Sequence, residues 1–354
     1  MDSPQAKVNR AIIYSDPPTT ATKIVELPIE KPGPGQVLVR LFYSGVCHTD
    51  HGFCTNSFGF PAPALKGQIG GHEGVGEVVE QGPGVNAPAI GAKVGIKYAA
   101  DACLNCDNCL IGGETTCPSV KVSGYYTPGT FQQYVLSSAT YVTPIPDGID
   151  LAGAGPLMCG GITVYTGLKR AGTRSGDWVL VSGAGGGLGH LGIQYAKAIG
   201  ARVIALDHGS KEAFCKELGA DAFVDFTKFE KDEDLKQEVW KIAKKGVKTV
   251  LCCASSSKAY AQAMPFLGFR GALVCIGVPA GELVGVSVGA MIGRELTVFA
   301  IKAGNRQDAK ECLEIAARGL VKTHYQLRTM DSLTDIFNEL EAGTIHGRAV
   351  IDLR

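Results

Sequence analysis

The 354-residue chain has no excess of charge of either sign, no long apolar run and almost no tryptophan. Its 34 basic residues balance its 34 acidic ones, which argues against nucleic acid or an anionic membrane as a partner. No apolar run is long enough to cross a bilayer. The N-terminal Met-Asp-Ser-Pro-Gln shows neither a secretory signal nor an amphipathic presequence, so we expect a cytoplasmic, reducing compartment. By contrast, the chain is rich in glycine, with 47 residues, and in cysteine, with 12.

Four of the cysteines form one short run with the spacing C-x2-C-x2-C-x7-C, namely Cys103, Cys106, Cys109 and Cys117. Four thiolates in so short a loop satisfy tetrahedral zinc completely, and a closed site of this kind is structural. Two disulfide bonds are the alternative interpretation of four cysteines. The expected reducing compartment argues against disulfides and favours a structural zinc.

The length suggests two domains. Residues 36–41, 76–80 and 92–96 have strand patterns broken by Gly and Pro turns, which predicts a small, partly closed β-barrel. After about residue 160, strands alternate with helical patterns, and this predicts a parallel sheet covered on both faces. The strand at 349–351 is expected to return to the first domain. We therefore expect an α/β protein with domains at 1–158 and 159–298, and a returning segment at 299–354.

A glycine cluster follows the predicted strand Trp178–Ser182 and precedes a helical pattern. In that context the backbone turns sharply and cradles a pyrophosphate at the helix N-terminus. A plain tight turn is the alternative, and the spacing is not the strict G-x-G-x-x-G pattern. Asp207 ends the next strand, where a carboxylate holds the adenosine ribose hydroxyls and repels a 2′-phosphate, so NAD is favoured over NADP. The candidate residues of the cradle are Gly183, Gly185, Gly186, Gly187, Leu188 and Gly189.

Several further motifs, distributed over essentially the whole chain, resemble the medium-chain zinc alcohol dehydrogenases. They are Cys47-His48-Thr49-Asp50, Gly71-His72-Glu73-x2-Gly76-x5-Gly82, Phe131-Gln132-Gln133-Tyr134 and Cys159-Gly160-Gly161. The chain is most similar to the tetrameric ethanol-type enzymes of fungi and bacteria. The resemblance implies a GroES-like β-rich catalytic domain, a Rossmann domain with a doubly wound parallel sheet, and a homotetramer.

The resemblance also implies a second, catalytic zinc held by Cys47, His72 and Cys159, which gives two zinc ions per subunit. Glu73 is expected to ligate this zinc transiently, and Asp50 to orient His72. The implied reaction interconverts alcohols and aldehydes or ketones by hydride transfer with NAD(H), with zinc stabilising the alkoxide.

Further cofactor contacts follow from the same resemblance. His48 and Arg348 are expected to neutralise the pyrophosphate, Lys211 to contact the adenosine ribose, and Val278 to line the cofactor site.

The chain departs from the family pattern in the proton relay and in the substrate pocket. Thr49 supplies the relay hydroxyl, but the position of the usual histidine is Gly52, and His51 stands one place earlier. His51 either serves as the relay or is an ordinary loop histidine. Tyr98 and the region of Phe58 replace the tryptophans that narrow the ethanol-type pocket, so we expect a roomier pocket.

Three alternatives stay open at this point. A zinc-free quinone or enone reductase would keep the glycine cradle without needing the metal ligands. A non-catalytic NAD-binding module would bind NADH and structural zinc only. A polyol or aromatic-alcohol dehydrogenase would differ only in pocket residues.

Overall fold

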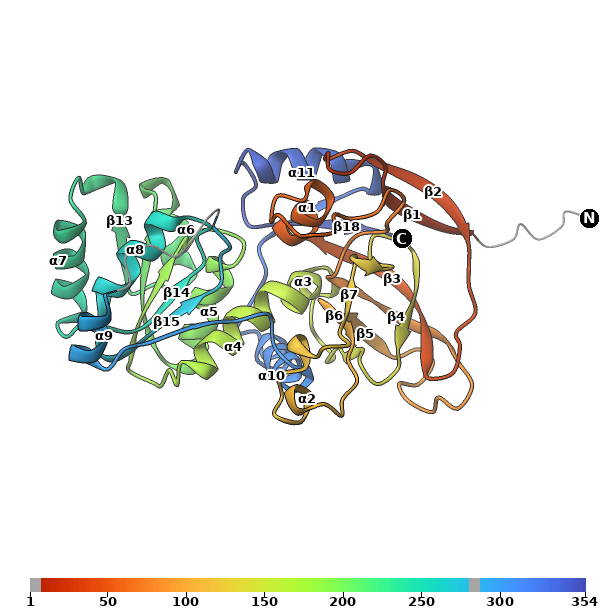
Figure 1. Cartoon of the computed structure of the whole chain (residues 1–354), viewed down its shortest axis with the longest axis horizontal. Helices are drawn as coiled ribbons and strands as arrows, with labels where there is room; N and C mark the ends of the chain where they lie inside the picture. The colour runs from red at the N-terminus through yellow and green to blue at the C-terminus, as the bar shows by residue number, and fades with distance from the viewer. Residues whose placement is uncertain (1–7, 280–286) are drawn as a thin grey trace, which may run out of the picture. The chain divides into compact units, whose positions relative to one another are not determined.

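The computed structural model describes residues 8–279 and 287–354 (Figure 1). The chain divides into two compact units. Unit 1 runs to Cys159 and also contains Asn305–Ala317 and His324–Arg354, whereas unit 2 consists of Gly160–Gly304 and Arg318–Thr323.

Unit 1 is built mainly of short antiparallel strands. Its main sheet has the order β10-β5-β4-β3-β18-β17, with β9 also paired to β3. A separate hairpin joins β1 and β2, and a small sheet contains β6, β7 and β8. The strands are β1 (Val8–Tyr14), β2 (Thr22–Pro28), β3 (Gln36–Val46), β4 (Gly74–Gln81), β5 (Lys93–Ile96), β6 (Ala99–Asp101), β7 (Lys121–Ser123), β8 (Tyr126–Thr127), β9 (Tyr134–Ser138), β10 (Thr143–Pro144), β17 (Tyr325–Arg328) and β18 (Arg348–Asp352).

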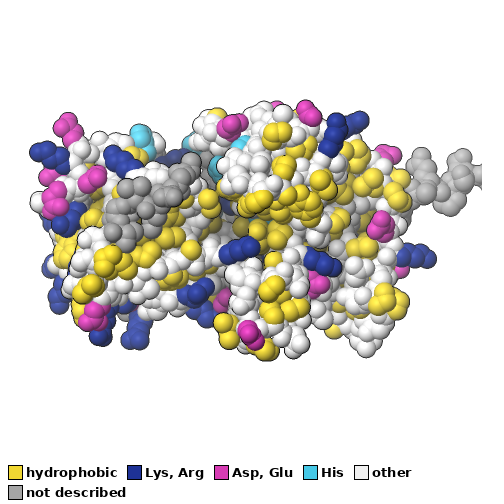
Figure 2. Space-filling model, viewed as in Figure 1, with side chains coloured by type: hydrophobic (Ala, Val, Ile, Leu, Met, Phe, Trp, Pro, Cys, Tyr) yellow, Lys and Arg dark blue, Asp and Glu magenta, His cyan; other side chains and the backbone are white. Residues whose placement is uncertain are grey.

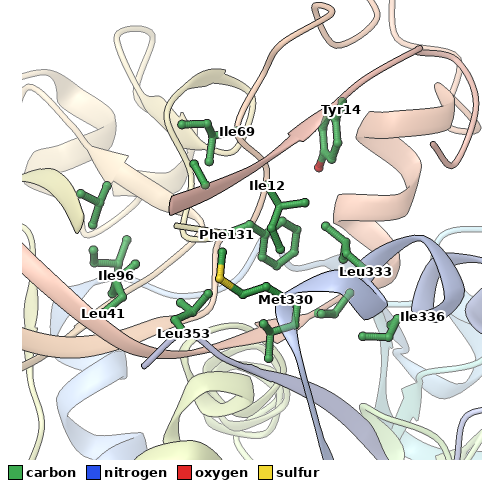
Figure 3. Packing of buried hydrophobic residues seen from close by; sticks show 14 of the residues in the cluster. Ile12, Tyr14, Leu41, Ile69, Ile96, Phe131, Met330, Leu333, Ile336 and Leu353 are labelled. Carbon is green, nitrogen blue, oxygen red and sulfur yellow. The ribbon is translucent and has the colours of Figure 1, made fainter. Parts of the chain in front are cut away.

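The helices of unit 1 are inserted between these strands. They are α1 (His48–Thr55), α2 (Asp107–Leu110), α3 (Leu151–Pro156), α10 (Arg306–Ala317) and α11 (Leu333–Glu341). Helix α11 closes the core of the unit: Leu333 and Ile336 pack with Ile12, Leu41 and Phe131 of the sheet region (Figure 3). The return of the chain after unit 2 therefore completes the hydrophobic core of unit 1.

Unit 2 is a six-stranded, wholly parallel sheet with the order β13-β12-β11-β14-β15-β16. Helices α7 and α8 pack on one face, where Leu180, Val250 and Cys252 join their apolar side chains. The strands are β11 (Trp178–Ser182), β12 (Arg202–Asp207), β13 (Ala222–Asp225), β14 (Val247–Cys252), β15 (Leu267–Cys275) and β16 (Thr297–Ala300). The helices are α4 (Ile162–Arg170), α5 (Gly189–Ile199), α6 (Glu212–Glu217), α7 (Asp232–Ala243), α8 (Ser257–Phe266) and α9 (Val288–Arg294).

The division of the chain differs from the expected boundaries in two respects within the returning segment. We expected the return at residue 299, but it begins at Asn305, and Arg318–Thr323 stays with unit 2. Hydrogen bonds explain the second difference, because Gln194 of α5 accepts from the Lys322 amide (2.8 Å) and donates to the Lys322 carbonyl (2.9 Å).

Within residues 8–279 and 287–354, one helical segment, Leu151–Arg170, is long and apolar enough to cross a membrane by length and composition. Of its most apolar 18-residue window, 83% is buried inside the protein, as expected for a core helix. On the face shown in Figure 2, acidic and basic side chains are interspersed, in keeping with the even charge balance.

Candidate active site and nucleotide site

Four potential metal ligands converge inside unit 1. The ligand atoms of Cys47, His72, Glu73 and Cys159 all lie within 4.8 Å of one another. Cys47 follows β3 and caps α1, His72 and Glu73 directly precede β4, and Cys159 lies in a π-helical turn at Leu157–Gly161. Residues from three separate segments of the chain thus bring their ligand atoms together.

Asp50 organises two members of this group from the first turn of α1. Its Oδ1 lies 2.6 Å from Nδ1 of His72, and its Oδ2 accepts from the Cys47 amide at 2.9 Å. The side chains of Asp50 and His72 are fully buried. A proton on Nδ1, shared with the carboxylate, leaves Nε2 of His72 as a ligand atom, and Nε2 lies 3.2 Å from Sγ of Cys159.

Glu73 forms a buried ion pair with Arg348, which also donates to the Val46 carbonyl at 3.1 Å. Burial raises the pKa of Glu73 to about 7, against the opposing effect of Arg348. Among the described residues, Oε2 of Glu73 has no hydrogen-bond partner. An ideal Cβ on Gly45 would lie 2.0 Å from this oxygen, so glycine at position 45 leaves the space that the carboxylate occupies.

This set of donors fits zinc. Two thiolates and one imidazole suit zinc, and an orphaned buried carboxylate oxygen stands among them. The hydrogen bond with Cys159 lowers the pKa of Cys47 well below its usual range, which favours the thiolate that a metal needs.

The second group consists of the four cysteines predicted from their spacing. The sulfurs of Cys103, Cys106, Cys109 and Cys117 lie within 4.8 Å of one another, and all four are free thiols. The disulfide alternative is therefore not adopted in this structure. Hydrogen bonding from the Asn105 amide lowers the pKa of Cys103 to about 6, as suits a thiolate ligand.

In unit 2 the glycine turn 183–189 connects β11 to α5. Gly183 has φ +68°, and a Cβ on Gly189 would lie 2.1 Å from the Gly183 carbonyl oxygen, so both positions require glycine. The Gly185 amide donates to Oδ2 of Asp207 at 2.7 Å, and the Lys211 side chain lies against Gly185. Structure thus brings the glycines of the turn, Asp207 and Lys211 together, with Gly186, Gly187 and Leu188 in the same turn.

The remaining predicted cofactor residues are not part of the 183–189 segment. Val278 is 59% exposed beyond the end of β15. His48 is exposed at the start of α1 in unit 1. Arg348 is buried, and its guanidinium is paired with Glu73. Its contact with the pyrophosphate, which the family resemblance implied, stays a prediction.

Gly52 stands where the family usually has its relay histidine, and the side chain of Phe58 fills the space beside it. A Cβ on Gly52 would lie 2.2 Å from the ring of Phe58, so Phe58 fills the space beside Gly52. His51 is buried on α1, edge-on to Phe337 of α11 with ring centroids 5.8 Å apart. Its Nε2 has no hydrogen-bond partner among the described residues. Thr49 is half-buried in the same turn.

One aromatic ring of unit 1 lies beside a metal ligand, and four others form a connected cluster. The Tyr98 ring stands edge-on to the His72 imidazole, at 5.8 Å and 86°. Tyr125 stacks on Phe53 at 4.6 Å and contacts Phe60, which contacts Phe58. Sequence reasoning singled out Tyr98 and Phe58 but missed Tyr125 and Phe60, because nothing in their local sequence marks them.

Comparison with known proteins defines the class. Residues 187–318 match the family model of the zinc-binding dehydrogenases, and residues 33–147 match that of the alcohol dehydrogenase GroES-like domain. The chain therefore belongs to the zinc-binding alcohol dehydrogenase family, and the predicted family and fold class are confirmed.

Named relatives support this assignment. Alcohol dehydrogenase 2 of Emericella nidulans is 48% identical over 359 residues, covering 98% of each chain. Alcohol dehydrogenase of Schizosaccharomyces pombe is 40% identical over 332 residues, covering 94% of this chain and 93% of its own. Among solved structures, an NAD-dependent alcohol dehydrogenase superposes with a TM-score of 0.89 at 25% identity, covering 98% of this chain and all of that one.

Proposed function

We propose that Cys47, His72 and Cys159 hold the catalytic zinc of an NAD-dependent alcohol dehydrogenase, with Glu73 as a ligand that exchanges with substrate. The single observation that carries this is the buried convergence of two sulfurs, one imidazole nitrogen and an orphaned carboxylate oxygen. When bound, zinc supplies a Lewis acid that lowers the pKa of a substrate hydroxyl, and NAD supplies a hydride acceptor.

The chain's own residues prepare this chemistry. Asp50 fixes the tautomer and orientation of His72 through the contact at Nδ1. Arg348 holds Glu73 by one oxygen, so the other oxygen stays available to the metal. In unit 2, the Gly183–Gly189 turn offers backbone amides to a pyrophosphate, and Asp207 selects the 2′-hydroxyl of NAD over a 2′-phosphate.

Thr49 and His51 are the candidates for moving the proton. We infer that the Thr49 hydroxyl takes the proton from the substrate hydroxyl and that Nε2 of His51 receives it next. The unpartnered state of this buried nitrogen among the described residues supports the inference. Burial lowers the pKa of His51, which keeps the ring neutral and able to accept a proton near pH 7.

For substrate, we infer alcohols and ketones larger than ethanol, in particular aryl ones. The half-buried ring of Tyr98 supplies a flat apolar surface beside His72, and the half-buried rings of Phe58, Phe60 and Tyr125 form a connected aromatic cluster in the same unit. Aryl groups pack on such surfaces with a gain of about 0.5–1.5 kcal/mol per ring pair beyond area burial. These aromatic rings therefore favour an aromatic-alcohol dehydrogenase as the second candidate function.

Turnover of NADH with a panel of carbonyl compounds, from acetaldehyde to bulky aryl ketones, tests the proposal. The panel is run with native protein and with protein stripped by a chelator. We expect metal-dependent turnover with kcat/KM that holds or rises with the aryl group. A steep fall beyond acetaldehyde would refute the roomy pocket, and tight NADH binding without any turnover would favour a binding module.

A homotetramer in the cytoplasm is part of the same proposal. Strand β16 is an edge strand, and exposed apolar side chains of Phe269, Val288 and Ile292 lie in the neighbouring β15 and α9. Hydrophobic side chains also gather in the α9 region in Figure 2. Such a surface favours association of subunits. Sedimentation at concentrations from 0.1 to 10 times a typical assay tests the subunit number.

A further inference from the structure

Lys97 is a buried lysine that neither metal group nor the glycine turn uses. It directly follows β5 and is only 3% exposed. Its Nζ donates to Oγ1 of Thr143 at 3.2 Å and to the Tyr141 carbonyl, and it lies 4.0 Å from the centroid of the Tyr141 ring. Because an amino group is costly to bury, this arrangement needs a reason beyond chain packing.

Tyr141 connects Lys97 to the four-cysteine loop. Its hydroxyl donates to Oε2 of Glu114 at 3.0 Å, and Glu114 lies between Cys109 and Cys117 in the loop. The Tyr141 ring also packs in one buried cluster with the side chains of these two cysteines. Tyr141, a partner of Lys97, therefore contacts the four-cysteine loop directly.

The next residue, Tyr98, faces the catalytic ligands. Its ring stands edge-on to His72, and the field of Cys159 adds to the burial that raises the pKa of Tyr98 to about 12. Ser123 fixes the backbone of both residues: its hydroxyl donates to the Lys97 carbonyl and its amide to the Tyr98 carbonyl, each at 2.9 Å. The Lys97–Tyr98 pair thus joins the cysteine loop to the catalytic centre.

We propose that Lys97 is a positioning residue that couples the four-cysteine loop to the Tyr98 ring beside His72. The four-cysteine site then affects the reaction without contacting substrate, because it determines the position of the Tyr98 ring beside His72. The kinetic part of this inference depends on the proposed function. The coupling itself does not, because it concerns contacts within unit 1.

The substitution Lys97→Met keeps the side-chain length and removes the donor. Networks of this kind change coupling about twofold to thirtyfold in equilibrium or rate. We expect Lys97→Met to change the ratio of kcat/KM for an aryl ketone to that for acetaldehyde within this range. In a Tyr98→Ala background the same substitution should leave the ratio unchanged. Equal effects in both backgrounds would refute the proposal, because a general loss of packing acts whether or not Tyr98 is present.

A readout without turnover separates this proposal from the proposed function. Cobalt(II) placed in the catalytic group has absorption bands that report the geometry of its ligands. We expect Lys97→Met to shift these bands and to speed release of zinc from the four-cysteine loop to a metallochromic chelator. Lys93→Met is the matched control, since Lys93 begins β5, the strand that Lys97 follows, but is paired with Glu77 and partly exposed. Lys93→Met should neither shift the bands nor speed the release of zinc. Unchanged bands in Lys97→Met would overturn the coupling even if the turnover of this variant were altered.

Thr143→Val is the milder variant if Lys97→Met does not fold. It removes only the 3.2 Å acceptor of Nζ. We expect a smaller shift of the cobalt bands and of the substrate ratio than a full loss of the donor would cause. The absence of any shift in a folded Thr143→Val protein would refute the role of Lys97.

Discussion

The most direct test of the catalytic centre is the substitution Asp50→Asn. The Asp50 carboxylate accepts two hydrogen bonds with different oxygens, from Nδ1 of His72 at 2.6 Å and from the Cys47 amide at 2.9 Å. An asparagine has one acceptor oxygen and one donor nitrogen, so it satisfies only one of these donors. If the nitrogen faces His72, the imidazole proton moves to Nε2, which then cannot bind a metal.

The expected size follows from that lost contact. A buried donor left without a partner costs about 1–3 kcal/mol. At about 1.4 kcal/mol for each factor of ten, zinc affinity of the catalytic group should fall roughly fivefold to 150-fold. This agrees with the roughly tenfold to hundredfold losses typical when the residue that orients a metal-bound histidine is replaced. The four-cysteine loop should keep its zinc.

Zinc content after dialysis against a series of chelator concentrations measures both sites. Asp150→Asn is the matched control, because Asp150 also accepts from two amides, those of Ala152 and Gly153, as the N-cap of α3. Asparagine is an equally good N-cap, so this variant should bind zinc as the native protein does. Native zinc affinity in Asp50→Asn would refute the role of Asp50, and equal losses in both variants would indicate a general loss of stability.

Three further predictions concern packing, cofactor choice and pH. Gly52→Ala should lower the free energy of unfolding by about 1–3 kcal/mol, because the added methyl group would overlap the ring of Phe58. Gly293→Ala is the control, because the space around Gly293 is open and this substitution should not destabilise the protein. Urea unfolding compares the two variants. Asp207→Ser should raise the KM for NADH roughly tenfold or more and improve use of NADPH, measured as the ratio of the two kcat/KM values; an unchanged ratio would contradict the assignment. Burial lowers the pKa of Lys97 to about 7 in the folded protein. Above pH 7 the Lys97 amine is therefore protonated in the unfolded chain but largely neutral in the folded protein, so the free energy of unfolding rises with pH. The native protein should therefore gain up to about 1.4 kcal/mol per pH unit relative to Lys97→Met between pH 7 and 8.5, and parallel stability curves would contradict this.

Features that depend on residues close in sequence could be predicted without the structure. The four thiols of the cysteine loop lie within fifteen residues, so their convergence follows from chain length alone. The alternation of apolar strands with helical patterns likewise predicted the parallel sheet of unit 2, and the turn at 183–189 followed from its glycines. The catalytic ligands are different, since Cys47 and Cys159 are far apart in sequence and only the family resemblance joined them.

Lys97 illustrates what sequence could not show. A lysine is rarely buried, and nothing near position 97 departs from an ordinary strand end. Its burial depends on Tyr141 and Thr143, which lie 44 and 46 residues later and approach only because β10 pairs with β5. The same holds for Arg348, whose pairing with Glu73 spans 275 residues.

The relay shows how a single unexpected residue changes the structure around it. Replacing the usual histidine by Gly52 would leave an open space beside α1, but the ring of Phe58 fills it. A proton carried along this helix therefore cannot end at position 52. His51 lies on the same helix and faces Phe337, with the field of Glu341 opposing the effect of burial on its pKa. If Thr49 passes its proton along α1, His51 is the buried histidine of this helix that can receive it, whereas His48 is exposed. His51→Gln should then slow alcohol oxidation below pH 7 more than above it, where hydroxide in solution takes over the proton.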